Sequence, residues 1–222
     1  MIGHASIDEN KKTKGGNAGD QTGREVFKRS WYSKPWNAVL RIKDDRMAES
    51  MAQCCEYICD SNLVGYDQNQ RNTLRKELQR VGWNLQRLTT PCETDCSAFM
   101  AVCAEYAGVP ISEQYINGNA PTTANMVVKF FNTGMFDVLT DTIYLSNENN
   151  LKRGDILVGK GHTAMCLTNG INSGVKPTLS KGSKGSWVKY MQGRLVLKGY
   201  KLDIDGDFGA QTMLSLVAFQ GE

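Results

Sequence analysis

The chain has 222 residues, of which 26 are Lys or Arg and 23 are Asp or Glu, so its formal net charge at pH 7 is +3. This length supports one core domain of roughly 170 residues and a small appendage. No basic segment is interleaved with aromatic residues and no apolar run could cross a bilayer, so the sequence excludes nucleic acid as a partner and insertion into a membrane.

The N-terminal segment, residues 1–12, is polar and has no secretory signal. It contains His4, which is one of the two histidines and so a competing candidate for a catalytic base, but a histidine in such a segment is expected to be solvated rather than catalytic. The chain has seven cysteines, and an odd number argues against a disulfide framework. We therefore expect synthesis in a reducing cytoplasm.

Residues 13–34 form a glycine-rich segment that leads to the aromatic residues Trp31, Tyr32 and Trp36. Two interpretations stay open. The segment could line a substrate groove, with Asp20 or Gln21 forming hydrogen bonds to the substrate. It could equally be an ordered loop whose aromatic residues pack on the core.

Apolar residues at helical spacing predict three scaffold helices, at residues 46–60, 67–81 and 122–131. Gly82 and Gly134 follow the last two and are expected to end them. The first contains Cys54, Cys55 and Cys59, which are predicted to be small packed side chains near its C-terminal end, where the helix dipole disfavours a thiolate.

The segment Thr94-Asp95-Cys96-Ser97-Ala98-Phe99 predicts the start of a further helix, which Gly108 ends. Asp95 is a suitable N-cap, so Cys96 falls in the first turn. Unpaired N–H groups in that turn favour a thiolate and can hold an oxyanion. Cys96 is therefore the candidate nucleophile.

Two short apolar runs, residues 156–158 and 162–167, flank Gly159-Lys160-Gly161 and predict a β-hairpin with His162 at the start of its second strand. An imidazole there could reach the N-terminus of a helix packed on the sheet. Cys96 and His162 together form a candidate catalytic couple.

Cys92 is the alternative nucleophile, because it lies in a loop without a helix start of its own. Zinc at Cys92 and Cys96 would need two more ligands, and the chain has only two histidines and no second paired cysteine motif. We expect neither a metal nor an organic cofactor.

The Asp-Cys-Ser motif and the Gly154-Asp155-apolar strand before His162 resemble the papain-like NlpC/P60 cell-wall hydrolases over roughly residues 60–170. The resemblance implies an α+β, papain-like domain with helices packed on a small antiparallel sheet. It also implies hydrolysis of peptidoglycan amides by Cys96 and His162, with Asp95, Ser97 and Tyr66 supporting the substrate or the oxyanion.

In that family a third polar residue orients the histidine from about twelve positions further on. Position 174 is Gly, so the pattern breaks there. Asn169, Asn172 and Ser173 are the nearest substitutes, and Asn169-Gly170 is also a turn dipeptide. Asn172 is the favoured prediction.

Residues 182–220 resemble the small helical peptidoglycan-binding domain, which implies wall contacts by side chains of residues 185–222; the candidates are Trp187, Tyr200, Asp205 and Phe208. The predicted boundaries are 1–174 for the hydrolase domain, 175–184 for a linker and 185–222 for this module.

Asp203, Asp205 and Asp207 alternate like calcium ligands, but Phe208 and Leu214 occupy the positions of the required Gly and Glu. Residues 175–222 carry seven Lys or Arg and four Asp or Glu, so attraction to an anionic wall polymer is expected.

The sequence thus predicts a monomeric, endolysin-type enzyme of bacteriophage origin whose partner is bacterial peptidoglycan. It would wait in the host cytoplasm until lysis and then cut stem peptides as an endopeptidase. Three alternatives remain: an N-acetylmuramoyl-L-alanine amidase, a non-catalytic wall-binding protein with a degenerate papain-like domain, and a cysteine enzyme that acts on proteins.

Overall fold

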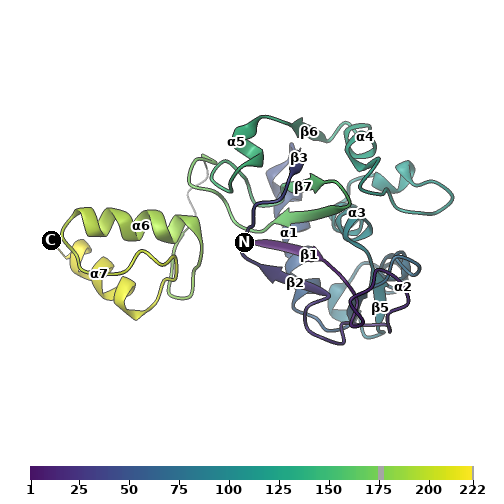
Figure 1. Cartoon of the computed structure of the whole chain (residues 1–222), viewed down its shortest axis with the longest axis horizontal. Helices are drawn as coiled ribbons and strands as arrows, with labels where there is room; N and C mark the ends of the chain where they lie inside the picture. The colour runs from purple at the N-terminus through teal and green to yellow at the C-terminus, as the bar shows by residue number, and fades with distance from the viewer. Residues whose placement is uncertain (175–177, 222) are drawn as a thin grey trace.

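The computed structural model describes residues 1–174 and 178–221. Its largest element is a six-stranded sheet with strand order β2-β1-β8-β7-β3-β6, in which each neighbouring pair is antiparallel (Figure 1). The strands are β1 (Ile2–Ala5), β2 (Val26–Arg29), β3 (Trp36–Ile42), β6 (Phe136–Leu139), β7 (Ile156–Gly159) and β8 (His162–Cys166). The hairpin predicted around Gly159-Lys160-Gly161 is confirmed as β7 and β8.

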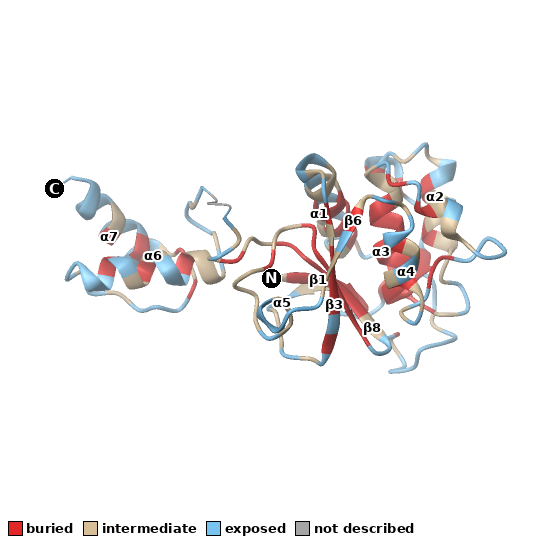
Figure 2. Ribbon diagram, turned by 90° about the horizontal axis from the view of Figure 1, so that it is seen from above, coloured by how far each residue is buried: buried red, intermediate tan, exposed pale blue. Residues whose placement is uncertain are grey.

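The two faces of the sheet are covered by different cores. The larger core packs α1 (Asp45–Cys59) and α3 (Cys96–Tyr106) against strand residues such as Leu40 and Met165. The smaller core contains Trp36 and Ala164, with α5 (Thr142–Leu145) beside it. Figure 2 shows that buried residues are concentrated in the sheet, α1 and α3. Helix α3 is therefore held rigidly against the sheet, with every residue from Cys96 to Ala104 buried.

The N-terminal strand β1 lies inside the sheet, between β2 and β8. Its register pairs Ile2 with Cys166 and Gly3 with Met165. Continuing that register places His4 diagonally across from His162, within reach of a ring-to-ring contact. The expectation that His4 is a solvated terminal residue is wrong, because its side chain is only 2% exposed.

The remaining elements form a second layer around α3. They include a parallel pair of strands, β4 (Val64–Tyr66) and β5 (Cys92–Thr94), and the helices α2 (Thr73–Arg80) and α4 (Met126–Phe131). Two short 3-10 helices, Leu85–Arg87 and Ile111–Gln114, complete the layer.

Helix α2 is shorter than predicted, because the expected helix at residues 67–81 begins only at Thr73. Asp67 instead accepts hydrogen bonds from the backbone N–H groups of Gly15 (3.1 Å) and Asn69 (2.6 Å). A side chain that bonds to nearby backbone competes with helix formation. The helix expected from 122 likewise starts later, at Met126.

The glycine-rich N-terminal segment is an ordered loop. The Asp20 carboxylate accepts hydrogen bonds from five consecutive backbone N–H groups, Thr22 through Val26. Gln21 donates its side-chain amide to the carbonyls of Ala18 and Gly19, at 3.0 Å each. Asp20 and Gln21, the two side chains considered for substrate binding, therefore form their hydrogen bonds with the backbone of the loop itself.

Two residues before β7 fix its start. Gly154 adopts φ +91°, and a Cβ at this position would lie 2.7 Å from the carbonyl oxygen of Ala48 in α1. Asp155 is 1% exposed and forms a two-point ion pair with Arg41 of β3, with Nε–Oδ1 at 2.8 Å. Asp155 also accepts the backbone N–H of Lys152 at 2.7 Å. The Gly-Asp motif therefore joins β7 to α1 and β3.

Residues 178–221 contain two helices, α6 (Ser186–Leu197) and α7 (Ala210–Gln220). The buried apolar residues of this segment are Val188 and Leu195 of α6 and Phe208, which lies just before α7. Gln192 lies at the centre, where it donates to Asp205 (2.8 Å) and accepts the N–H of Gly206 (2.9 Å). Part of the predicted linker, residues 175–177, lies outside the described residues.

The Arg41–Asp155 pair gives a stability prediction. Replacing Asp155 with Ala should lower the free energy of unfolding by about 3–5 kcal/mol, because Arg41 would keep a mostly buried, unpaired charge. The exposed pair between Lys43, just after β3, and Asp137 of β6 is the control, and Asp137→Ala should cost about 0–1 kcal/mol. Urea denaturation measures both, and equal losses would contradict the assignment.

Candidate active site

Cys96 begins α3 directly after β5, separated from it by Asp95 alone. Asp95 is the N-cap and accepts the backbone N–H of Ala98 at 2.8 Å, as the sequence predicted. Because α3 packs on β8, the Cys96 sulfur lies close enough to the backbone N–H of Thr163 to interact with it. Thr163 directly follows His162, so the fold brings the Cys96 sulfur to the backbone at the start of β8.

The Cys96 thiol is neutral in this environment. Burial raises its pKa to about 12, and the Asp95 carboxylate raises it further, while the N–H groups of Thr163 and Ser97 and the charge of Arg71 oppose the shift. The sequence led us to expect that the helix N-terminus would favour a thiolate. Desolvation has the larger effect on the Cys96 pKa, because the residue is only 5% exposed and a charged sulfur there would lose most of its hydration.

His162 is hydrogen-bonded to the second histidine. Its Nε2 lies 3.0 Å from Nδ1 of His4, and the two rings meet edge to face. Trp36 lies beside His162, with ring centroids 6.3 Å apart. In the described part of the chain, no hydrogen bond joins the His162 ring to Cys96. Since Nε2 of His162 is hydrogen-bonded to His4, Nδ1 is the ring nitrogen that remains to interact with a thiol.

Both imidazoles are uncharged at neutral pH. Burial, followed by the charges of Lys34 and Arg29, lowers the pKa of His162 to about 4. Burial and the neighbouring His162 lower the pKa of His4 to about 3. A neutral imidazole has a free lone pair on one ring nitrogen, so His162 is in the form that can accept a proton.

Cys96 opens onto a cavity of about 320 Å³. Apart from Cys96 its walls are almost entirely polar; they comprise Lys14, Gln68, Asn69, Arg71, Asp95, Ser97, Thr122, Thr123 and Gly161. The turn of the β7–β8 hairpin, at Gly161, therefore forms one wall of the cavity, and the start of α3 forms another. A polar cavity next to a buried thiol suits a polar, peptide-like substrate.

Tyr66 lies close to the nucleophile, as predicted. Burial raises the pKa of the Tyr66 phenol to about 12, and the electrostatic interaction with the Cys96 sulfur is the second cause. Its hydroxyl oxygen accepts a hydrogen bond from Gln68 at 3.2 Å, which leaves the hydroxyl proton for another acceptor.

A model of the endolysin-like domain family matches residues 2–173. The chain belongs to this family. Neither a curated protein nor a solved structure matches it. An endolysin-like domain indicates a cell-wall lytic function with peptidoglycan as the substrate.

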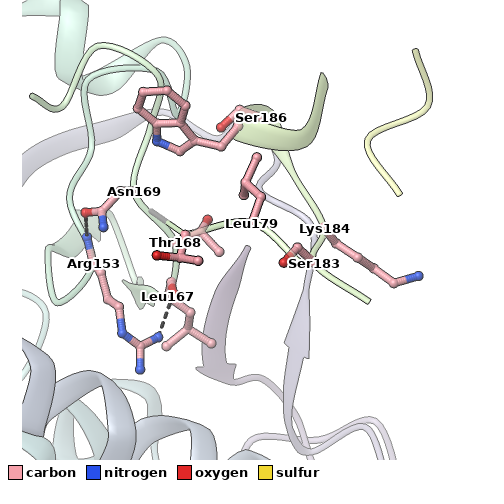
Figure 3. Close-up of a pocket in the computed structure, with 10 residues that line it drawn as sticks. Arg153, Leu167, Thr168, Asn169, Leu179, Ser183, Lys184 and Ser186 are labelled. Carbon is pink, nitrogen blue, oxygen red and sulfur yellow. Dashed lines mark hydrogen bonds between the residues drawn. The ribbon is translucent and has the colours of Figure 1, made fainter. Parts of the chain in front are cut away.

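The endolysin-like domain does not bring the predicted third residue to the site. Asn172 lies in the loop after the far end of β8, where its N–H donates to the Asn149 carbonyl at 2.8 Å. Asn169 accepts the backbone N–H of Arg153 at 3.0 Å, beside a second cavity of about 240 Å³ (Figure 3). That cavity shares no lining residue with the one at Cys96.

The sequence analysis set His4 aside as a solvated residue and did not consider Arg71, although both lie at the site of the endolysin-like domain. His4 occurs in a short polar segment, and no local pattern identifies it as a strand residue. Arg71 lies before α2 and contacts both Asp95 and Ser97. The net positive charge of the chain gave no signal that this particular arginine lies at the site, with its side chain only 11% exposed.

Cys92, the alternative nucleophile, is 2% exposed in β5 and does not line the Cys96 cavity. Gln21 is bonded within its own loop, as described above. Tyr32 packs at a tilted angle against both His4 and Trp36, with ring centroids 6.4 and 5.8 Å away, so this part of the aromatic cluster lies beside the histidines.

The predicted wall-binding residues have different environments. Phe208 is 1% exposed and belongs to the interior of its module, so its side chain cannot contact a ligand. The Asp205 carboxylate accepts hydrogen bonds from the Gln192 side chain and from the backbone N–H of Asp207. Trp187 packs against Tyr190, and Tyr200 packs against Phe219.

Among the described residues, no helix has the length and apolar character needed to cross a bilayer. Within residues 1–174 and 178–221, no three side chains of His, Cys, Asp or Glu are spaced to hold a metal ion.

The histidine pair gives a pH prediction. His162 should carry its proton on Nε2 at pH 7 and should become doubly protonated only as the pH falls to about 4, because burial disfavours the imidazolium. Nitrogen-15 NMR of the imidazoles measures the tautomer and the titration. In the His4→Ala variant the single tautomer should be replaced by a mixture. A His162 pKa near 6.5 in the wild-type protein would contradict the prediction.

Proposed function

We propose that the endolysin-like domain is a cysteine hydrolase that cuts an amide bond in the stem peptides of peptidoglycan. The observation that carries the proposal is the position of Cys96: its sulfur lies at the start of a buried helix, on a polar cavity, and next to the strand residue that follows His162. The match to the endolysin-like domain supports the choice of substrate.

The reaction begins with a neutral thiol and a neutral imidazole. When the substrate amide enters the cavity, Nδ1 of His162 takes the proton of Cys96 while the sulfur attacks the carbonyl carbon. The imidazolium that forms can donate its Nε2–H to Nδ1 of His4, 3.0 Å away. His4 is thus a positioning residue that fixes the tautomer of His162, which is the role given to Asn172 by the sequence analysis.

The tetrahedral intermediate carries a negative charge on the former carbonyl oxygen. The backbone N–H of Cys96 and the proton of the Tyr66 hydroxyl are the donors proposed for this oxyanion. His162 then protonates the departing amine, leaving a thioester on Cys96. Water, activated by His162, hydrolyses the thioester and restores the free thiol.

The helices α6 and α7 are proposed to hold the enzyme on the wall. Trp187 and Tyr200 are the aromatic candidates that remain after Phe208 is excluded by its burial. Binding of this kind raises the local concentration of enzyme on an insoluble substrate without altering the chemistry.

Mass spectrometry of fragments released from purified peptidoglycan tests the proposal. The wild-type protein should release fragments with new amine termini inside the stem peptide, and Cys96→Ala should lower the rate at least about 1,000-fold, because the nucleophile is lost. Cys92→Ala is the matched control, since Cys92 is also buried with a pKa raised to about 12. It should retain activity.

Other outcomes of the same experiment decide between the alternatives. Free sugar chains with intact stem peptides would identify an amidase that uses the same Cys96. Full activity in Cys96→Ala would contradict the cysteine mechanism. No fragments from any of the proteins would leave a non-catalytic wall-binding protein.

A further inference from the structure

The Arg71 guanidinium connects the start of α3 to a wall of the cavity. Nε and Nη2 donate to the two oxygens of Asp95, at 2.6 and 3.1 Å. Nη2 also donates to Ser97 Oγ at 2.8 Å. Further donations reach the carbonyls of Ala120 (from Nη1, 2.8 Å) and Pro121 (from Nη2, 2.9 Å). One side chain therefore fixes the N-cap, the residue after the nucleophile, and the loop before Thr122.

Asp95, the ion-pair partner of Arg71, stabilises the helix that carries Cys96 but disfavours the Cys96 thiolate. The Asp95 carboxylate is needed to cap α3 through Ala98 and to accept the Ser97 hydroxyl at 3.0 Å. Its negative charge, however, opposes ionisation of the adjacent Cys96 thiol. Arg71 and Asp95 are both about one-tenth exposed, so water screens this charge weakly. A carboxylate in this position needs a fixed counter-charge if a thiolate is to form beside it.

We propose that Arg71 is a positioning residue that holds Asp95 and Ser97 in place and neutralises the Asp95 carboxylate while the Cys96 thiolate forms. The inference rests on the proposed role of Cys96 as the nucleophile. A planar guanidinium can satisfy both carboxylate oxygens and still reach neighbouring carbonyls, whereas an ammonium supplies only a point charge. Arg71 therefore contributes charge and geometry separately.

Other ionisable groups surround Cys96 and must stay constant in a test. Tyr66 and Tyr32 lie close enough for Cys96 to affect their ionisation. Lys14 lines the same cavity, and the His162–His4 pair lies at the start of the adjacent strand. The two tyrosines and the two histidines are uncharged near neutral pH, so the nearest charges are Asp95 and Arg71 with Lys14 at the cavity wall.

The chain offers a matched control for Arg71. Arg75 of α2 forms a two-point ion pair with Glu105 near the other end of α3, with both N–O distances at 2.7 Å. This pair is about as buried as the Arg71–Asp95 pair and also ties the α2 region to α3. It lies away from the cavity, so its loss tests the structural effect alone.

The experiment compares Arg71→Gln, Arg71→Lys and Arg75→Gln by two readouts. The first is the rate constant for alkylation of Cys96 by iodoacetamide across pH, with the site identified by peptide mass spectrometry. The second is kcat and KM for a soluble muropeptide. The thermal midpoint of each variant shows whether it is folded.

Arg71→Gln should alkylate Cys96 about ten-fold more slowly at a given pH below the thiol pKa, because one pKa unit changes the thiolate fraction ten-fold. Its kcat should fall more than its KM rises. Arg71→Lys should recover most of the alkylation rate, because the charge is restored, but not kcat, because the two-point geometry is lost. Arg75→Gln should match the wild type in both readouts.

Equal alkylation profiles and equal kcat values for Arg71→Gln and Arg75→Gln would overturn the inference. If Arg71→Gln does not fold, Arg71→Lys decides, and an unchanged kcat in that variant would overturn it. Alkylation does not depend on peptidoglycan, so a failure of the proposed hydrolase function would be seen separately, either as full activity in Cys96→Ala or as the absence of fragments from every protein.

Discussion

The pairing of β1 with β8 is the constraint on which the candidate site depends. It places His4 beside His162, although 158 positions separate them in the chain. Without this pairing, His162 would stand at the start of a sheet-edge strand with a solvated ring and no fixed tautomer. The N-terminal strand therefore does more than close the sheet, because it supplies the group proposed to orient the base.

The electrostatics of the site follow from burial. The thiol and both imidazoles are uncharged in the structure, since each would lose hydration on ionising. This arrangement differs from a preformed thiolate–imidazolium pair. In the proposed mechanism, proton transfer from Cys96 to His162 would be coupled to attack on the substrate, and the Arg71–Asp95 pair would limit the electrostatic cost of the charge that develops.

Much of the local structure around the site could be predicted from the sequence, because short-range rules decide it. Asp95 caps α3 through its own side chain, and Gly161 permits the turn into β8. Residues far apart in the chain could not be placed in this way. A four-residue strand such as β1 has no periodicity of its own and exists through its partners, so His4 was misjudged.

The error at Asn172 has a similar origin. It is near His162 in sequence, but a strand rises about 3.3 Å per residue, so β8 carries the chain to the opposite end of the sheet before Asn172 is reached. Arg71 shows the reverse case, because its role depends on contacts with Asp95, Ser97 and two carbonyls that no local pattern encodes. The site residues that sequence reasoning found are those positioned by their immediate neighbours.

The central claim is that the Cys96 sulfur becomes covalently bonded to the acyl part of the substrate. Rapid quenching of the protein with a soluble muropeptide, followed by mass spectrometry of the intact chain and of its peptides, measures this directly. The account predicts a transient mass increase equal to the acyl fragment, located on the peptide that contains Cys96. Hydrolysis that proceeds with no adduct on Cys96, or with an adduct on another residue, would contradict it.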